Sequence, residues 1–252
     1  MKVLVIGSGG REHALVWKIS HSKKVKEIFA LPGNSGMNEL AKTIDIKASN
    51  IIEIADFAQE KKINLTVVGP ELPLSLGIVD EFNRRNLKIF GPTQKAAMIE
   101  SSKIFAKEFM KKNKIPTSDF QTFNYPNDAK EFLKNTQFPV VIKADGLAGG
   151  KGVFICNSIE PAEASINSIM IEKKFGKSGE QIIIEEYLSG QEMSFMIISD
   201  GKRAIPLVSS MDYKKIFDGD KGPNTGGMGA ISPSPLSDKN LYTTIMKTII
   251  IP

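Results

Sequence analysis

The chain of 252 residues has little cysteine, no membrane-length apolar run and no block of like charges. Its single cysteine, Cys156, cannot form an internal disulfide, which excludes a disulfide-built extracellular scaffold and favours a reducing compartment. A membrane helix needs about 20 consecutive apolar residues, and no run approaches that length. The start at Met1–Ile6 runs directly into glycines and lacks the longer apolar core of a signal peptide. We therefore expect a soluble, cytoplasmic protein without a membrane segment.

Charge is spread along the chain, and internal repeats are absent. The net charge of +5 comes from 33 Lys and Arg against 28 Asp and Glu residues. Scattered lysines indicate a solvated surface and argue against nucleic-acid binding, although anionic small molecules would suit this charge. The content of 41% apolar and 24% charged residues is that of a globular protein. The length allows two modest domains, or one large domain with an inserted lobe.

The first 92 residues alternate between short apolar runs and helical patterns. Continuous apolar strands in repeated β-α-β order predict a doubly wound α/β domain with a parallel sheet. The expected strands are Val3–Ile6, Lys26–Leu31, Leu65–Val68 and Leu87–Phe90, and the expected helices are Glu12–Ser20, Ile51–Lys61 and Ile78–Arg85.

The pattern after residue 93 predicts a different, α+β domain. A long helix is expected first, followed by two strands that a glycine-rich loop joins, and later by a hairpin that turns at Asp200–Gly201. The Gly- and Pro-rich stretch from Met211 to Pro235 is expected to be a long functional loop. The other expected elements are helices Gln94–Lys112, Glu160–Met170 and Leu241–Ile251, and strands Phe138–Lys143, Gly152–Cys156 and Gln181–Tyr187.

Three loops that follow predicted parallel strands, Gly7–His13, Pro32–Gly36 and Gly69–Glu71, are expected to form one pocket. Loops at the carboxyl ends of such strands line the ligand crevice, and a helix N-terminus after glycines suits an anion. A dinucleotide fingerprint would have glycine where Glu12 stands, so a small phosphorylated metabolite fits better. The alternatives are a tight turn that binds nothing and an ordinary exposed arginine at position 11.

The loop Lys143–Val153 carries the strongest single signal, because it combines four glycines with two lysines between strands. It is not a Walker A loop, since Asp145 and Gly152 stand where that motif needs a glycine and a Ser or Thr. A loop of this kind can fold over a nucleotide and offer its N–H groups and ammonium to the phosphates. The alternative is a surface hairpin. The pair Glu185 and Glu186 ends a later strand, whose backbone edge could read adenine, but such pairs are usually only solvated.

In chain order, these motifs and the segment Gly222–Ala230 closely resemble the phosphoribosylamine–glycine ligase (glycinamide ribonucleotide synthetase) family of the ATP-grasp superfamily. The resemblance runs from Met1 to Pro252. It implies that ATP, glycine and 5-phosphoribosylamine give glycinamide ribonucleotide, ADP and phosphate through a glycyl phosphate, in purine biosynthesis. It also implies small-molecule substrates, no nucleic-acid partner and a monomer.

The resemblance assigns roles to residues by position. Lys143, Lys151 and Asp212 would be catalytic. The ATP-binding residues would be Lys103, Lys143, Gly149, Gly150, Lys151, Gly152, Glu185, Glu186, Leu188 and Glu192. The substrate-binding residues would be Gly9, Gly10, Arg11, Asn34 and Glu71 for phosphoribosylamine, and Asn224, Thr225 and Gly226 near the acceptor. The implied division is 1–102 for phosphoribosylamine, 103–188 for the first ATP-grasp lobe with its lid, and 189–252 for an incomplete second lobe.

Two departures from the family pattern affect these expectations. Met211–Lys215 stands where the family has Gln-Asp-His-Lys-Arg, so Asp212 is kept but Lys215 cannot make a bidentate arginine contact. Family members continue into a strand whose Glu and Asn bind Mg²⁺ or Mn²⁺, so the metal ligands are expected beyond Pro252. Two alternatives remain: a fragment that binds nucleotide without turnover, and an ATP-grasp ligase for another carboxylate.

Overall fold

The structure is a computed structural model that describes residues 1–148, 151–219 and 221–252. Its contacts divide the chain into two units, each described here by itself. Unit 1 comprises Met1–Ala106, Ala144–Lys151 and Phe175–Gly179, and unit 2 comprises Lys107–Lys143, Gly152–Lys174 and Glu180–Pro252.

Unit 1 is built on a five-stranded sheet in the order β3-β2-β1-β4-β5, with every neighbouring pair parallel. The strand order reverses between β1 and β4, as in doubly wound folds. This confirms the predicted α/β class. The strands are β1 (Lys2–Gly7), β2 (Glu27–Pro32), β3 (Lys42–Thr43), β4 (Leu65–Val68) and β5 (Ile89–Phe90).

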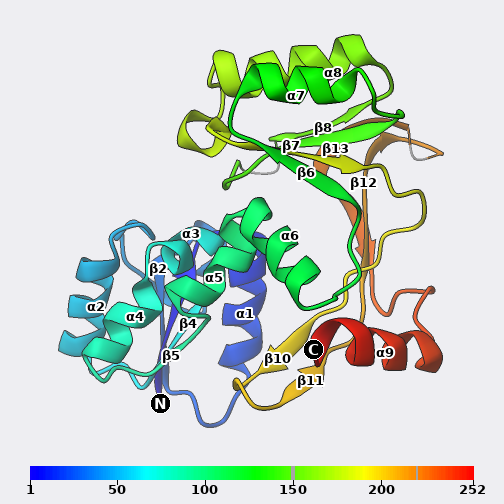
Figure 1. The fold of residues 1–252 in the computed structure, drawn as a ribbon. Helices are drawn as coiled ribbons and strands as arrows, with labels where there is room; N and C mark the ends of the chain where they lie inside the picture. The colour runs from blue at the N-terminus through cyan, green and yellow to red at the C-terminus, as the bar shows by residue number, and fades with distance from the viewer. Residues whose placement is uncertain (149–150, 220) are drawn as a thin grey trace. The chain divides into compact units, whose positions relative to one another are not determined.

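Helices cover both faces of this sheet (Figure 1). Alternate residues of β1 point to opposite faces, so Leu4 and Ile6 pack with Phe82 in one core cluster, while Val3 and Val5 pack in the other. Complete burial of each such side chain contributes roughly 1.5–3 kcal/mol. The helical segments of unit 1 are α1 (Gly10–Ser20), a 3₁₀ turn at Ser35–Met37, α2 (Ile51–Glu60), α3 (Glu71–Ser75), α4 (Ile78–Arg84), α5 (Gln94–Ser101) and the start of α6 (Lys103–Lys112).

The single helix predicted for Gln94–Lys112 is wrong, because it is two helices broken at Ser102. Ser102 is extended, with φ −136° and ψ 114°. Its hydroxyl accepts the Phe105 N–H and donates to the carboxylate of Asp145. That carboxylate also accepts the Ile104 N–H at 2.8 Å. Ser102 and Asp145 therefore satisfy N–H groups that the first turn of α6 leaves open.

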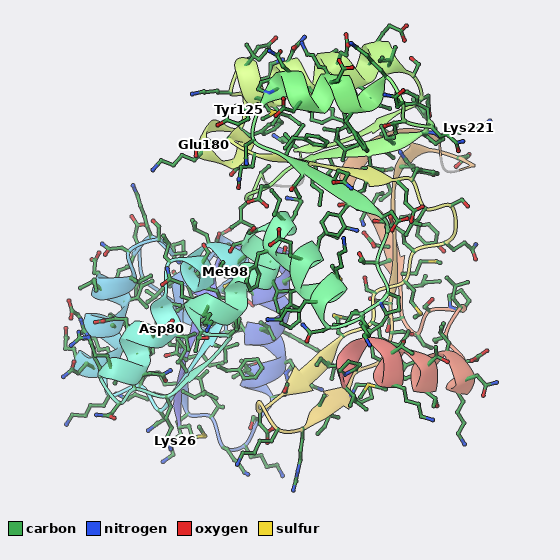
Figure 2. The ribbon with its side chains drawn as sticks, in the orientation of Figure 1. Lys26, Asp80, Met98, Tyr125, Glu180 and Lys221 are labelled. Atoms are coloured by element: carbon green, nitrogen blue, oxygen red, sulfur yellow. The ribbon has the colours of Figure 1, made fainter. Side chains whose placement is uncertain are left out.

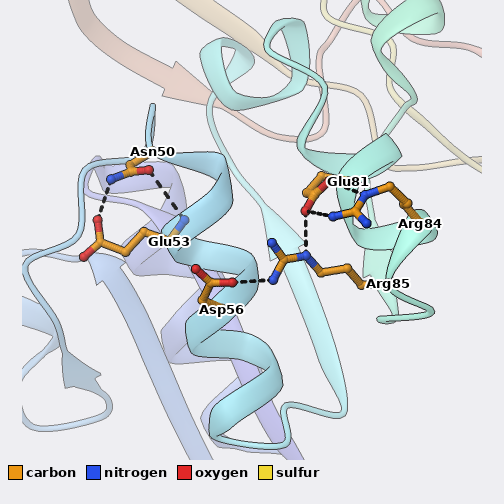
Figure 3. Close-up of polar contacts among 6 residues, drawn as sticks. All are labelled: Asn50, Glu53, Asp56, Glu81, Arg84 and Arg85. Atoms are coloured by element: carbon orange, nitrogen blue, oxygen red, sulfur yellow. Dashed lines mark hydrogen bonds and ion pairs between the residues drawn. The ribbon is translucent and has the colours of Figure 1, made fainter.

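Carboxylates also fix the outer helices of unit 1. Asp80 of α4, labelled in Figure 2, accepts a hydrogen bond at 2.7 Å from the Gln94 N–H at the start of α5. Figure 3 shows Glu81 between Arg84 and Arg85, with Arg85 reaching Asp56 of α2. Hydrogen bonds from Arg84 and then Arg85 lower the pKa of Glu81 to about 2. This cluster ties α4 to α2 and stays charged at neutral pH.

Unit 2 contains a four-stranded sheet in the order β6-β9-β7-β8, with α7 and α8 on one face (Figure 1). The predicted strands 138–143, 152–156 and 181–187 are confirmed, and β7 and β8 form the expected antiparallel pair around the glycine-rich loop. The segments are β6 (Phe120–Phe123), α7 (Pro126–Leu133), β7 (Val140–Ala144), β8 (Val153–Cys156), α8 (Ile159–Ile166), a π-helical turn (Asn167–Ile171) and β9 (Ile182–Glu186); a 3₁₀ turn at Gly176–Gly179 belongs to unit 1.

The last part of unit 2 consists of two hairpins and a helix. The hairpin around Asp200–Gly201 is confirmed as β10 (Ile197–Ser199) and β11 (Ala204–Pro206). The long loop predicted for Met211–Pro235 is wrong, because β12 (Met211–Phe217) and β13 (Lys221–Ile231) pair antiparallel. Backbone hydrogen bonds form this ribbon without help from an alternating apolar pattern. Helix α9 (Lys239–Ile245) and a π-helical turn (Met246–Ile250) follow.

Cys156 ends β8 with 1% of its surface exposed. Its sulfur lies 3.6 Å from the Ser165 hydroxyl of α8, and burial raises the pKa of the thiol. Among the described helices, none has both the length and the apolar character needed to cross a bilayer.

Candidate functional site

The three glycine-containing loops of unit 1 converge at the carboxyl ends of β1, β2 and β4. The Arg11 guanidinium lies 3.3 Å from Glu71 Oε1, joining the loops that follow β1 and β4 across the point where the strand order reverses. The Asn34 amide donates to the Ser8 carbonyl at 2.9 Å. The predicted residues Arg11, Asn34 and Glu71 thus belong to one loop cluster, where open parallel sheets bind their ligands.

Glu12 explains why the first loop departs from a dinucleotide motif. Its side chain is 4% exposed and lies under the loops, accepting the Gly9 N–H at 2.7 Å. A Cβ on Gly7 or Gly69 would come within 2.4 Å of the Glu12 side chain, so both glycines are needed for this close approach. The carboxylate occupies the space beneath the turn and fixes its shape.

Above Glu12, the start of α1 is exposed to solvent. Gly9, Gly10 and Arg11 are all exposed, and the first turn of a helix leaves N–H groups without intrahelical partners. A guanidinium beside such a helix start suits a phosphate ester, which accepts several charged hydrogen bonds. The chemistry of this corner of unit 1 therefore suits a phosphorylated ligand.

The first half of the loop Lys143–Val153, the predicted lid, is anchored within unit 1. Lys103 donates to the carbonyls of Asp145 and Gly146, the latter at 3.0 Å. The Ser178 hydroxyl donates to the Leu147 carbonyl at 2.9 Å. Lys151 is exposed, and its N–H donates to Ala148. The predicted residues Gly149 and Gly150 lie outside the described part of the chain, and Gly152 is buried just before β8.

A buried charge network lies at the sheet of unit 2. Lys143 of β7 contacts Glu185 Oε2 at 3.0 Å, and Lys107 of α6 contacts the same oxygen at 3.3 Å. Ser118 donates to that oxygen at 2.8 Å. Burial disfavours the charged form of Glu185, but Lys143, Ser118 and Lys107 outweigh it and lower the pKa of this carboxyl. Burial lowers the pKa of Lys107, and Glu185 opposes that shift.

The sequence prediction included Lys143 and Glu185 but missed Lys107 and Ser118. Lys107 belongs to the helical run of mixed lysines and apolar residues from 103 to 112, where a lysine is ordinarily a solvated side chain. Its burial follows from the chain returning to it at Thr117, Ser118 and Glu185, which only the fold reveals.

The other predicted adenosine residues are more exposed. Glu186 accepts the Asp119 N–H at 3.0 Å, and the Leu188 side chain is 63% exposed. Glu192 pairs with Lys214 at 3.0 Å, and Asp212 lies 3.8 Å from the same ammonium. This brings Glu192 and Asp212 to one lysine, whose pKa is raised first by its hydrogen bond with Glu192.

The predicted acceptor residues lie on β13. The Thr225 hydroxyl donates to the Lys214 carbonyl at 2.9 Å and accepts the Gly227 N–H, so it joins the two strands of the ribbon. Gly226 is exposed. Asn224 is paired with Lys215 through the backbone, and its side chain lies outside the described part of the structure.

A divalent metal is implied by the resemblance, so we tested whether the residues fit one. In residues 1–148, 151–219 and 221–252, no group of three His, Cys, Asp or Glu side chains could hold a metal ion. The best-placed acidic groups, Glu185, Glu192 and Asp212, are each already engaged by lysine. These residues do not fit a metal, and we assign no step to one.

Two models of one protein family match the chain, one in its N-terminal part and one in the rest. Residues 1–100 match the family model "Phosphoribosylglycinamide synthetase, N domain", and residues 101–252 match "Phosphoribosylglycinamide synthetase, ATP-grasp (A) domain". All 252 residues align with the phosphoribosylamine–glycine ligases of Caldanaerobacter subterraneus, at 50% identity, and Clostridium acetobutylicum, at 48%. The chain spans 60% and 61% of these relatives' lengths.

A solved structure agrees with the sequence comparison. The crystal structure of phosphoribosylamine–glycine ligase from Thermotoga maritima is 33% identical, with a TM-score of 0.78 over 94% of this chain and 56% of that one. Together, the two family models account for every residue of the sequence and confirm the predicted ATP-grasp resemblance. The chain belongs to the phosphoribosylglycinamide synthetase family.

Proposed function

We propose that this chain supplies the phosphoribosylamine-binding and ATP-binding parts of an enzyme that ligates glycine to 5-phosphoribosylamine. The observation that carries this proposal is the alignment of all 252 residues with relatives that bear the name phosphoribosylamine–glycine ligase. The whole enzyme's reaction is a proposal for this chain, since the chain spans 60% of the first of those relatives.

The proposed reaction has two displacement steps. A glycine carboxylate oxygen attacks the γ-phosphorus of ATP, so that ADP leaves and glycyl phosphate forms. The amine of phosphoribosylamine then attacks the glycyl carbonyl carbon, loses a proton and expels phosphate. An acyl phosphate is lost if water reaches it, so a covering loop protects the intermediate. Positioning and charge neutralisation are the main demands of phosphoryl transfer.

Phosphoribosylamine is assigned to the loop cluster of unit 1. Its phosphate would lie at the start of α1, against the Gly10 N–H and the Arg11 guanidinium. Gly9, whose own N–H donates to Glu12, would shape the turn at this site. Asn34 would donate, and Glu71 would accept, hydrogen bonds at the sugar and its amine. This assignment is supported by the Arg11–Glu71 contact of 3.3 Å, which holds a cation and an anion at the same sheet edge.

ATP is assigned to the loop Lys143–Val153 and to the residues at and after the end of β9. Lys103, Lys143 and Lys151 would neutralise phosphates together with the loop glycines 149, 150 and 152. Glu185, Glu186 and Leu188 would flank adenine, and Glu192 would take the ribose hydroxyls. Asp212, Asn224, Thr225 and Gly226 would line the acceptor side. We further propose a monomer in the cytoplasm.

The test is a turnover assay of the 252-residue chain with ATP, glycine and phosphoribosylamine. We expect ADP release that requires both glycine and phosphoribosylamine, and loss of that release in Lys143→Met and Lys151→Met. A matched control is Lys26→Met, a surface lysine of unit 1 outside the proposed sites. ATP binding without ADP release would instead support nucleotide binding without turnover. Turnover with a different carboxylate would indicate another ATP-grasp ligase.

A further inference from the structure

Glu185 lies between two lysines that approach it from different elements of unit 2. Lys107 and Glu185 each have a side-chain exposure of 7%, whereas Lys143 has 25%. Both ammonium groups lie against one oxygen, Oε2, at 3.3 and 3.0 Å. The two cations therefore differ in access to solvent but share one counter-ion.

Lys107 is held by partners besides Glu185. Its ammonium donates to Thr117 Oγ1 at 2.7 Å, to the Ser118 carbonyl at 2.9 Å, and to the Ser118 hydroxyl. It also lies 5.4 Å from the centre of the Phe120 ring. An ammonium has three protons to donate, and here fixed neighbours receive them. Lys107 can therefore stay in place whether or not Lys143 contacts Glu185.

An anionic ligand that attracts Lys143 would take it away from Glu185. A buried carboxylate left without a cation is costly, so this exchange needs a second positive charge that remains. Lys107 supplies that charge, and Ser118 continues to donate to the carboxylate at 2.8 Å. A phosphate oxygen on Lys143 then replaces Glu185 without leaving a charge unpaired.

We propose that Lys107 is a positioning residue that keeps Glu185 paired and so releases Lys143 to bind a nucleotide phosphate. This inference rests on the proposed function, since it takes the ligand of Lys143 to be a nucleoside di- or triphosphate. Adenosine, which carries no phosphate, should not depend on Lys107 in this way.

The test compares the binding of ATP, ADP and adenosine to the 252-residue chain by calorimetry. In Lys107→Met, Glu185 has only Lys143 as a cation, so Lys143 is less available and affinity for ATP and ADP should fall on the order of tenfold. Affinity for adenosine should stay unchanged. In Lys107→Met combined with Glu185→Gln, the carboxylate no longer holds Lys143, so the ratio of ATP affinity to adenosine affinity should recover. Taking this ratio cancels any change in the adenine contact of residue 185.

Lys111→Met is the matched control. Lys111 lies one turn further along α6 and 5.7 Å from the same Phe120 ring, but within the described residues it forms no ion pair with Glu185. Its ATP affinity should equal that of the unaltered chain. Thermal unfolding of each variant shows whether it is folded. If Lys107→Met does not fold, Lys107→Arg is measured instead; it keeps the positive charge and should retain ATP affinity.

A second measurement does not depend on nucleotide binding. Acetylation of Lys143 by acetic anhydride, followed by mass spectrometry, should slow in Lys107→Met and accelerate in Glu185→Gln. If the unaltered chain binds no nucleotide, the proposed function fails and this inference with it. If it binds ATP but Lys107→Met binds equally well, or if the double variant does not recover, the inference alone is overturned. Equal loss of adenosine binding would indicate a merely structural lysine, which also contradicts it.

Discussion

The Glu12 carboxylate lies so close beneath Gly69 that a Cβ on Gly69 would come within 2.3 Å of Glu12 Oε1. Gly69 follows β4, and Glu12 belongs to α1, so this contact joins two of the loops that form the proposed phosphoribosylamine site. The shape of that site therefore depends on a residue that contacts no expected ligand.

Replacing Gly69 with alanine should destabilise the chain by about 1–3 kcal/mol, because overpacking forces a buried side chain to shift. Urea unfolding measures the change in the free energy of unfolding. Gly10→Ala is the control, since a Cβ added to Gly10 would meet no described atom within 4 Å. Adding Glu12→Ala to Gly69→Ala should relieve part of the loss. Equal stability of Gly69→Ala and Gly10→Ala would contradict the close contact.

Removing the Ser102 hydroxyl should weaken the start of α6. Its oxygen accepts the Phe105 N–H at 3.1 Å and its proton is donated to Asp145 at 3.0 Å. Loss of a serine cap costs about 1 kcal/mol, so Ser102→Ala should lower stability by that amount and speed amide exchange at Ile104 and Phe105. Ser101→Ala, one residue earlier in α5, is the control and should change neither quantity. Unchanged exchange in Ser102→Ala would rule out the capping role.

Acid should weaken the Glu81 cluster in a defined pH window. Folding lowers the pKa of Glu81 from 4.5 to about 2, chiefly through its hydrogen bond from Arg84. Its contribution to stability is therefore complete above pH 4.5 and is lost as the pH falls toward 2. Urea unfolding between pH 7 and pH 2.5 should show a shallower acid loss in Glu81→Gln than in the unaltered chain. Arg84→Met removes the main cause of the lowered pKa, so the loss of stability should be complete at a higher pH and be smaller. Parallel plots of unfolding free energy against pH for all three proteins would contradict this role of the cluster.

Replacing Arg11 should weaken the binding of a sugar phosphate to unit 1. Ribose 5-phosphate is a suitable probe, because it carries the phosphate and ribose of the proposed substrate. Hydrogen bonds to charged groups contribute about 1.5–3 kcal/mol, so Arg11→Met should lower affinity roughly tenfold or more. Arg11→Lys should retain only part of the affinity, since lysine cannot donate two parallel hydrogen bonds to a phosphate as arginine does. Arg84→Met, at an exposed position of α4, is the control and should bind ribose 5-phosphate normally.

The parallel sheet of unit 1 was predictable because its strands are continuous apolar runs and its helices have regular apolar spacing. The break at Ser102 was not predictable, because the residues of Gln94–Lys112 together favour a helix. The break is stabilised by a contact with Asp145, which lies more than forty residues further along the chain. The ribbon of β12 and β13 escaped prediction for another reason. Its glycines carry no alternating pattern, and its strands pair mainly through backbone groups.

The candidate site was predictable where residues follow strands in sequence and unpredictable where the fold brings distant residues together. The loops that carry Arg11, Asn34 and Glu71 each follow a predicted strand, so their shared sheet edge could be inferred. Lys107 had no such signal, because a buried lysine needs partners that lie ten and seventy-eight residues further along the chain, at Thr117 and Glu185. The roles of all these residues in binding remain predictions.

The burial of Cys156 makes its reaction with alkylating reagents a measure of how often unit 2 opens. Its thiol is 1% exposed, and it is the only thiol in the sequence. An alkylating reagent can react with it only after β8 and α8 separate, so the rate of labelling counts openings of that sheet. The rate of Cys156 alkylation, followed by mass spectrometry, can therefore be compared between each variant and the unaltered chain. A faster rate would show that the substitution makes unit 2 open more often.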